Sequence, residues 1–549
     1  MKFDPRHDPK HRERLNAQGL WPDRIITDLM DAAVAARPDH IAVTDVNTAT
    51  GRSTTLSYRE LRTISDRIAL GLVSMGVQRN DVVSVQLPNW WHFAGLYLAC
   101  VRIGAVINPL MPIFREREMS FMLGFCEAKL VVVPRRFRGF DHPAMIRNIR
   151  KDLPHLKGML VVDGEDEATS FEAQLINRRW EDEMDARKIF AERRPGPDDV
   201  CELIYTSGTT GQPKGVMHTA NTLISNIEQA GRQVGLNSDD VVFMASPIAH
   251  QTGFLYGMML PIYYKTKSVL QDIWDAVVAA QRIQDEGATF TMASTPFLAD
   301  LTHNEGVAKY DTSTLRNFIC AGASIPTVLA QAAAEKLRIR VISGWGMSEN
   351  GLVTTTRIGD APEKVFQTDG APITGMEIRV VDSDGRLLPP NTEGHLQARG
   401  LTSFVGYLKK PELDTTDADG WFDTGDNARI DPDGYVRITG RSKDIIIRGG
   451  ENIPVVEVEE LLYRHPDVQD ASIVGMPDER LGERGCAFLV LKPGRSMTFQ
   501  DMVSYFSDMK LAKNYWPERM EVLTEMPRTP SGKIQKFKLR EVAKELASA

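Results

Sequence analysis

The chain has 549 residues, too many for one compact core, so two or more domains are expected. The net charge of −8 and the scattered basic residues argue against a general nucleic-acid-binding protein. The five cysteines are far apart, odd in number and without metal-site spacing, which favours reduced thiols in a cytoplasmic protein.

Strands alternate with helices from the first quarter of the chain onward. Helices are predicted over 57–75, 90–103, 116–125, 221–234 and 273–285, and strands over 82–86, 105–108, 130–133, 200–205, 241–245, 268–270, 290–292, 318–320 and 339–342. This alternation predicts parallel sheets that are covered by helices. The apolar stretch 94–110 contains Arg102 and is predicted to be buried rather than to span a membrane. The polar start, 1–16, has no apolar core for export.

A second kind of pattern follows towards the C-terminus. Antiparallel β structure is predicted over 377–382 and 394–399. Past a boundary near 440–443 the elements restart, with strands at 445–447, 471–475 and 486–491 and helices at 454–464 and 499–510. The fold class is therefore α/β. Residues 1–441 are expected to form a large domain with mixed or parallel sheets between helices and a β-subdomain, and residues 442–549 a small mobile α+β domain.

A loop rich in glycine and hydroxyl groups follows the apolar strand 200–205. Three glycines allow close backbone approach to a ligand, and hydroxyls with a lysine add donors, so the loop suits a polyphosphate. Its candidate phosphate-binding residues are Thr206, Ser207, Gly208, Thr209, Thr210, Gly211 and Lys214. It is not a Walker A loop, because Pro213 stands where the second glycine is needed. The alternative is a flexible surface loop whose composition arose by chance.

This loop resembles the phosphate loop of the acyl-adenylate-forming superfamily, which contains acyl-CoA synthetases, peptide-synthetase adenylation domains and luciferases. Further motifs occur in the family's order, and the resemblance spans about 27–546. It implies that the chain binds ATP and a carboxylic acid and joins them as an acyl-adenylate.

The segment 344–349 ends in a lone carboxylate, Glu349, which suits a Mg²⁺ ion held mainly by phosphate oxygens. By itself Glu349 is more simply a solvated surface acid. In the family's motif this glutamate holds Mg²⁺ and an aromatic residue stacks on adenine. Trp345 stands where the family usually has tyrosine, so stacking is kept and a phenol hydrogen bond is lost. Gly346, Met347 and Ser348 complete the expected adenine-binding segment.

Two other segments match the nucleoside-binding parts of the family. Gly322, Ala323 and Ser324 follow a predicted strand and resemble the second adenine wall, although small residues there also suit close packing. Asp426 matches the ribose-binding aspartate, since one carboxylate can accept from both ribose hydroxyls. Arg441, fifteen residues later, is placed to bind ribose and phosphate oxygens.

The C-terminal motifs imply a second half-reaction. Lys443 falls at the family's hinge position, and Gly449 and Gly450 at its coenzyme A channel, although an exposed lysine and a plain turn are the alternatives. Lys533, on a loop bounded by proline and glycine, matches the catalytic lysine. The pattern around Lys533 also resembles sites that protein acetyltransferases modify in bacterial acyl-CoA synthetases, which would remove the charge.

Residues 246–254 resemble the start of the family's acyl pocket, with His250 as the gating aromatic and catalytic candidate; a buried structural histidine is the alternative. No acidic residue occurs in 243–263, and an α-amino acid would leave a buried cation unpaired there. An uncharged aliphatic, alicyclic or aromatic acid is therefore expected.

No carrier-protein segment follows Lys533, which favours coenzyme A as the acyl acceptor. Across its length the chain resembles bacterial short- and medium-chain acyl-CoA synthetases, and among these the ones that activate cyclohexanecarboxylate. The expected cofactors are thus ATP, Mg²⁺ and coenzyme A, and a partner acetyltransferase and deacetylase would act on Lys533. The alternatives are a ligase that loads a carrier protein and a non-catalytic nucleotide sensor.

Overall fold

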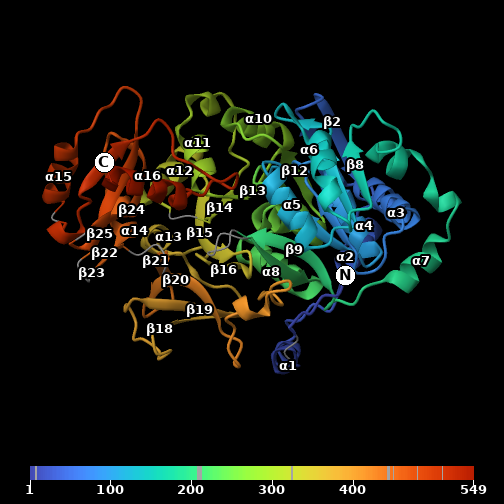
Figure 1. Ribbon diagram of the computed structural model, residues 1–549, viewed down its shortest axis with the longest axis horizontal. Helices are drawn as coiled ribbons and strands as arrows, with labels where there is room; N and C mark the ends of the chain where they lie inside the picture. The colour runs from blue at the N-terminus through green and yellow to red at the C-terminus, as the bar shows by residue number, and fades with distance from the viewer. Residues whose placement is uncertain are drawn as a thin grey trace.

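A computed structural model describes residues 1–6, 9–206, 213–322, 325–441, 446–448, 451–478, 480–509 and 511–548 (Figure 1). Its elements form two large sheets, a four-stranded β-subdomain and a C-terminal α+β unit, as the sequence predicts. The α-helices are α1 (Pro9–Ala17), α2 (Ile26–Ala36), α3 (Tyr58–Ser74), α4 (Trp91–Arg102), α5 (Glu116–Phe125), α6 (His142–Ile149), α7 (Ala186–Arg193), α8 (Ala220–Gln233), α9 (Leu260–Tyr264), α10 (Ala276–Glu286), α11 (Thr295–His303), α12 (Thr327–Leu337), α13 (Pro362–Gln367), α14 (Val455–Arg464), α15 (Phe499–Asp508) and α16 (Lys536–Ser548).

The larger sheet has nine strands, and its central strands run parallel. In sheet order they are β17 (Ala371–Pro372), β16 (Gly351–Thr355), β15 (Arg340–Met347), β14 (Asn317–Ala321), β13 (Phe290–Ala293), β11 (Val241–Met244), β12 (Lys267–Gln271), β1 (Ile41–Asn47) and β2 (Arg52–Ser57). The carboxyl ends of the parallel strands meet at one edge, which is where ligands bind in sheets of this type.

The second sheet has six strands and is parallel except for the hairpin at one edge. In sheet order they are β10 (Lys214–Thr219), β9 (Val200–Thr206), β4 (Val106–Pro109), β3 (Val82–Val85), β5 (Leu130–Pro134) and β8 (Gly158–Val162). A separate two-stranded ribbon, β6 (Arg136–Phe137) with β7 (Phe140–Asp141), follows β5 in the chain.

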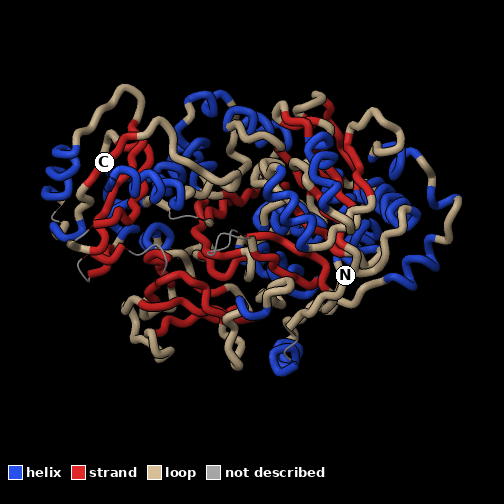
Figure 2. Tube along the Cα trace, viewed as in Figure 1, coloured by secondary structure: helices blue, strands red, loops and turns tan. Residues whose placement is uncertain are grey.

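Helices cover both faces of both sheets because the strands are apolar on both sides. On β11, Val242 and Met244 join the core that also holds α4 and α8, whereas Phe243 joins the core formed with α10, α11 and α12. On β3, Val83 faces the shared core and Val82 faces α5 and α6. The layers are therefore helices, six-stranded sheet, helices, nine-stranded sheet and helices (Figure 2).

Two smaller units follow. The β-subdomain is antiparallel, with β18 (Met376–Val381), β19 (Gly394–Gly400), β20 (Phe422–Ile430) and β21 (Val436–Arg441). The C-terminal sheet contains β23 (Glu451–Ile453), β22 (Ile446–Arg448), β25 (Gly482–Leu491), β24 (Val468–Asp478) and β26 (Arg519–Val522). Helices α14 and α15 pack in one core of this unit and α16 in the other. Figure 1 shows it in red beside α11 and α12.

One local expectation was wrong. The segment 344–347 does not follow a strand but forms the end of β15, paired with β16, since its glycines fit a narrow antiparallel hairpin. The segment that follows Arg448 lies between β22 and helix α14, as the sequence predicts, and its residues 451–453 form the short strand β23, which pairs with β22.

The apolar stretch around Arg102 forms α4 and β4, in which every residue except the partly buried Arg102 is buried. Within the described ranges no helix is long and apolar enough to cross a bilayer. All five cysteines are buried and free, as the composition predicts.

Candidate active site

The predicted site residues gather at the carboxyl edge of the nine-stranded sheet. β14 ends just before Gly322, β15 ends at the predicted adenine segment, and β13 leads directly into Ser294. β9 of the second sheet ends at Thr206, where the phosphate loop begins. Parallel strands thus deliver four chemically distinct segments to one region.

The phosphate loop joins the two strands of an antiparallel hairpin. Thr206, the last residue of β9, pairs in register with Lys214, the first residue of β10. The hairpin therefore fixes both ends of the loop. The predicted residues Ser207, Gly208, Thr209, Thr210 and Gly211 lie outside the described residues.

Tyr407 joins two of the predicted residues, and sequence reasoning missed it. Its hydroxyl donates a hydrogen bond to Glu349 Oε1 at 2.8 Å. The Lys214 ammonium lies 4.7 Å from the centre of the Tyr407 ring, within cation–π range. Tyr407 pairs with Val216 of β10 across an isolated bridge, which holds it beside the hairpin. No local signal marks this tyrosine in the sequence, because its partner is far away in the chain.

Glu349 is a buried carboxylate, 6% exposed. Burial raises its pKa, while the Tyr407 hydrogen bond and the charges of Lys214 and Arg441 act in the opposite direction. A buried carboxylate surrounded by cationic side chains can hold a further cation if a polyanion neutralises the cationic side chains.

Replacing Tyr407 by phenylalanine is expected to reduce adenylation efficiency (kcat/KM for MgATP) about tenfold. The change removes a hydrogen bond to a charged group but keeps the ring beneath Lys214. Acid-dependent exchange of pyrophosphate into ATP measures the effect. Tyr435 offers a matched control, since its hydroxyl bonds Asp360 and Lys364 lies 4.6 Å from its ring. An equal loss in the Tyr435 variant would contradict a specific role.

A second group of predicted residues forms a continuous polar contact. The Trp345 indole donates to Asp426 Oδ2 at 2.9 Å, and Arg441 Nε lies 3.3 Å from Asp426 Oδ1. Asp426 and Arg441 are register partners on β20 and β21. The indole thus provides a hydrogen bond of its own to the carboxylate, a contact that no sequence motif predicts.

Close packing explains the glycines in this region. A Cβ on Gly346 would lie 2.1 Å from the Gly351 carbonyl oxygen, so only glycine fits the hairpin. Gly322 has φ +91°, and a Cβ there would lie 3.2 Å from Lys533 Cε. Ala323 and Ser324 lie outside the described residues.

The loop that carries Lys533 is a tight turn docked on the large sheet. Thr529 N–H donates to the Lys533 carbonyl at 2.7 Å, and Lys533 N–H donates to Thr529 Oγ1 at 3.0 Å. The Ser294 hydroxyl donates to the Ser531 carbonyl at 2.7 Å. Arg528 forms an ion pair with Asp470 and donates to the Gly532 carbonyl.

These contacts place the Lys533 ammonium among the other predicted residues. Desolvation and, to a smaller extent, the charge of Arg441 lower the Lys533 pKa to about 8, against the opposing charges of Asp426 and Glu349. Burial and the charge of Lys533 lower the pKa of His250 to about 3, so His250 is neutral. Lys533 thus lies within electrostatic range of four predicted residues, namely His250, Glu349, Asp426 and Arg441.

His218 is another residue that the sequence did not reveal. It is fully enclosed on β10, and its ring contacts the Ser348 carbonyl at 2.7 Å and the Thr222 hydroxyl at 3.0 Å. Burial lowers its pKa to about 4, so the neutral ring donates to Ser348. The contact ties the strand after the phosphate loop to the residue before Glu349. Met347 packs in the apolar clusters beneath this segment.

Three predicted residues, Lys443, Gly449 and Gly450, lie outside the described residues.

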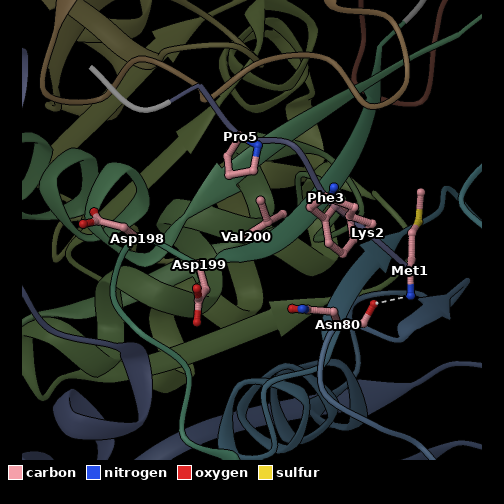
Figure 3. Close-up of a pocket in the computed structure, with 8 residues that line it drawn as sticks. All are labelled: Met1, Lys2, Phe3, Pro5, Asn80, Asp198, Asp199 and Val200. Carbon is pink, nitrogen blue, oxygen red and sulfur yellow. Dashed lines mark hydrogen bonds between the residues drawn. The ribbon is translucent and has the colours of Figure 1, made fainter. Parts of the chain in front are cut away.

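Figure 3 shows the residues that line a surface pocket of about 220 Å³, and none of them is a predicted site residue. Its lining includes Val200, at the opposite end of β9 from Thr206, and the Met1 amino group, which donates to the Asn80 carbonyl at 3.3 Å. The strand has seven residues, and Val200 and Thr206 are its first and last.

Two family models and several known proteins match this chain. Residues 30–408 match the family described as AMP-binding enzyme, and residues 457–533 match the AMP-binding enzyme C-terminal domain. The chain is 36% identical over 545 residues to the medium-chain fatty-acid–CoA ligase of Escherichia coli, covering 98% of this chain and 94% of that protein.

Two solved structures are similar over nearly the whole chain. The anthranilate CoA ligase AuaEII in complex with anthranoyl-AMP has a TM-score of 0.84 at 25% identity, covering 96% of this chain and 98% of that one. ATP-bound MatB from Rhodopseudomonas palustris has a TM-score of 0.82 at 26% identity, covering 95% and 100%.

Proposed function

The chain belongs to the AMP-binding enzymes and is an acid–CoA ligase of the AMP-forming kind, and we propose that it activates an uncharged, medium-sized carboxylic acid. The observation that supports acid activation is the position of Lys533 against Gly322, within electrostatic range of Glu349, Asp426 and Arg441. The absence of acidic residues from 243–263 and the similarity to a medium-chain ligase support the class of acid. A lysine there meets the developing charge of an acid that attacks a nucleotide phosphate.

Several proposed roles concern the nucleotide. Thr206, Lys214 and the loop between them hold the β- and γ-phosphates of ATP. Asp426, with Arg441, binds the ribose, and Trp345 together with the Gly322 segment encloses the adenine. The ATP-bound relative supports this assignment of the nucleotide to the same fold.

Glu349 is the proposed residue for Mg²⁺. Mg²⁺ in nucleotide sites takes one or two carboxylates and completes its shell with phosphates and water. One buried carboxylate beside Lys214 fits this donor set. Among the residues that the structure describes, no group of three His, Cys, Asp or Glu could hold a metal alone, so the remaining ligands would come from the nucleotide. Bound Mg²⁺ would neutralise phosphate charge.

In the proposed first half-reaction, the acid's carboxylate oxygen attacks the α-phosphorus of ATP. The bond to the pyrophosphate oxygen breaks, and acyl-AMP forms. Lys533 donates hydrogen bonds to the oxygens on which charge develops, and Lys214 holds the leaving pyrophosphate. His250, neutral and next to the acyl side of the site, closes the wall that excludes water from the adenylate.

In the proposed second half-reaction, a thiol displaces AMP from the acyl carbon. Residues 1–441 and 442–549 are proposed as the two domains, and the second turns about Lys443 and withdraws Lys533. The contacts that must break include Ser294 to Ser531 and the Thr327 hydroxyl to Glu460, 2.8 Å. Gly449 and Gly450 then line the path of coenzyme A.

The domain that carries Lys533 also suggests regulation. An acetyl group on Lys533 would remove its charge and stop adenylation. Lys533 is partly buried against Gly322, so the withdrawn state offers the ammonium to an acetyltransferase. Incubation with a protein acetyltransferase and acetyl-CoA, followed by peptide mass spectrometry, tests the idea; an unmodified Lys533 would remove it.

The test of the proposed function is AMP formation with MgATP and coenzyme A across a panel of acids. The panel contains cyclohexanecarboxylate, benzoate and straight-chain acids from C4 to C10. A sharp optimum at cyclohexanecarboxylate would identify a ring-shaped pocket, whereas an optimum among linear acids would place the chain with its Escherichia coli relative. If no acid of the panel led to AMP formation, the proposal would be contradicted.

A ligase that loads a carrier protein is the second candidate. It would form AMP only when a carrier replaces coenzyme A in the same assay. A non-catalytic sensor is the third, and the retention of Lys533, Glu349 and Asp426 in one site argues against it.

Adenylation is expected to decline as the pH rises through about 8. Lys533 must be charged, and burial lowers its pKa to about 8 from the ordinary value near 10.4, so the charged form is lost earlier than in an exposed lysine. The pH dependence of kcat/KM for the acid measures this. In Lys533→Arg the alkaline decline should vanish, because arginine stays charged.

Burial also raises the pKa of Glu202 to about 8, so Glu202→Gln is the control and should keep the decline. A wild-type profile that is flat from about pH 7 to 9.5 would contradict the assignment.

A further inference from the structure

The loop that carries His250 is fixed at two points by buried polar side chains from the six-stranded-sheet side. The first is Asn89, in the connection from β3 to α4. Its amide nitrogen donates to the carbonyls of Ser246 (2.9 Å) and Gln271 (3.1 Å), and its oxygen accepts from Ile248 N–H at 2.8 Å. All side-chain hydrogen-bonding atoms of Asn89 are engaged, so the start of the loop is anchored.

The second point is Gln251, immediately after His250. Its amide nitrogen donates to Glu202 Oε2 at 3.1 Å. Glu202 lies on β9 and is completely buried, and Gln251 is 4% exposed. Glu202 Oε1 and Gln251 Oε1 have no hydrogen-bond partner within the described part of the chain.

The two unpartnered oxygens are both acceptors, and a proton on Glu202 turns one of them into a donor. Burial raises the pKa of this carboxyl to about 8, and only the Gln251 hydrogen bond opposes that shift. At neutral pH the acid therefore carries a proton and provides a donor as well as an acceptor. A buried neutral acid paired with an amide has no charge to compensate, which explains how the core tolerates it.

The position of Glu202 links two parts of the candidate site. It lies four residues before Thr206, where the phosphate loop begins, and opposite His218 in the β9–β10 hairpin. Its partner Gln251 is next to the residue proposed to wall the acyl side. Strand β9 thus leads into the phosphate loop and, through Glu202, contacts the His250 loop. These two loops flank the proposed position of the substrate's carboxylate.

We propose that Glu202 is a positioning residue which, through Gln251, holds the His250 loop at a fixed place relative to the phosphate loop and so sets the acyl-binding wall. The proposal rests on the proposed function, because it assigns the acyl side of the site to His250. It adds a residue from the core of the second sheet to the determinants of acid binding.

Steady-state kinetics of Glu202→Ala, Gln251→Ala, the double variant and Glu202→Gln test this role. The KM for the acid should rise about tenfold in each alanine variant, while the KM for ATP stays within about twofold. The double variant should be no worse than either single one, because both remove the same contact. Glu202→Gln should restore the wild-type KM, since an amide also accepts the Gln251 hydrogen bond.

A second readout does not depend on the substrate. Carbethoxylation of His250 by diethyl pyrocarbonate, followed by peptide mass spectrometry, should quicken several-fold in the alanine variants and not in Glu202→Gln. Gln86→Ala is the matched control, since this buried amide directly after β3 donates to the Met111 and Phe114 carbonyls at 3.0 Å. It should change thermal stability without changing His250 reactivity.

Equal KM increases for acid and ATP, additive effects, or no rescue by Glu202→Gln would overturn the proposal. If the wild type turned over no acid, the proposed function would fail, yet the His250 reactivities would still decide whether Glu202 positions the loop. Unchanged reactivity in both alanine variants would reject it even in an active ligase.

Discussion

Lys533→Ala is expected to slow adenylation by about 10²–10³-fold and to leave most of the rate of thioester formation from added acyl-AMP. A Cβ on Gly322 would lie 4.0 Å from the Lys533 ammonium nitrogen, and the lowered pKa of Lys533 reflects desolvation at the place where charge would develop. The methyl group of alanine leaves the turn itself intact, because the turn is held by backbone and Thr529 contacts.

The two half-reactions are measured separately. Acid-dependent pyrophosphate exchange reports adenylation, and release of AMP from synthetic acyl-AMP and coenzyme A reports the second step. Lys538→Ala is the control, since this exposed lysine lies five residues away on the same domain. Equal losses in both half-reactions would contradict the idea that Lys533 serves only the first.

The sequence predicts elements well where both ends carry strong local signals. Helix α5 has the predicted bounds, Glu116–Phe125, since an acidic first turn precedes an apolar face. Strand β15 extends beyond its predicted end at residue 342. The prediction ended there because the glycines at 344 and 346 are typical of a loop. Their reason is tertiary: a Cβ on Gly346 would clash with the Gly351 carbonyl.

The candidate site divides in the same way. Lys214, Glu349, Asp426 and Lys533 could be predicted as candidates because their motifs are short and contiguous. Tyr407 and Glu202 could not, since each acts through a partner far away in the chain: Glu349 is 58 residues from Tyr407 and Gln251 is 49 from Glu202. A single sequence carries no information on such pairings, and only the folded sheets bring them together.

Glu349→Gln is expected to reduce adenylation by about 10²-fold and to weaken its dependence on Mg²⁺. Glutamine keeps the shape and accepts the Tyr407 hydrogen bond but has no charge to share with a cation. The direct readout is ATP binding, measured by calorimetry with and without Mg²⁺. The gain in ATP affinity that Mg²⁺ gives the wild type should shrink in the variant.

The melting temperature of Glu349→Gln shows whether its loss of adenylation comes from unfolding. A buried carboxylate costs desolvation energy, and its raised pKa is the sign of that cost, so removing the charge should leave the melting temperature of the free protein unchanged or higher. Glu202→Gln is the matched control, a second buried glutamate with a raised pKa that lies in the core and should remain active. Full activity of Glu349→Gln with unaltered Mg²⁺ dependence would assign the metal to other residues. Lower activity together with a higher melting temperature would mean that the site keeps a costly charge for the sake of the bound cation.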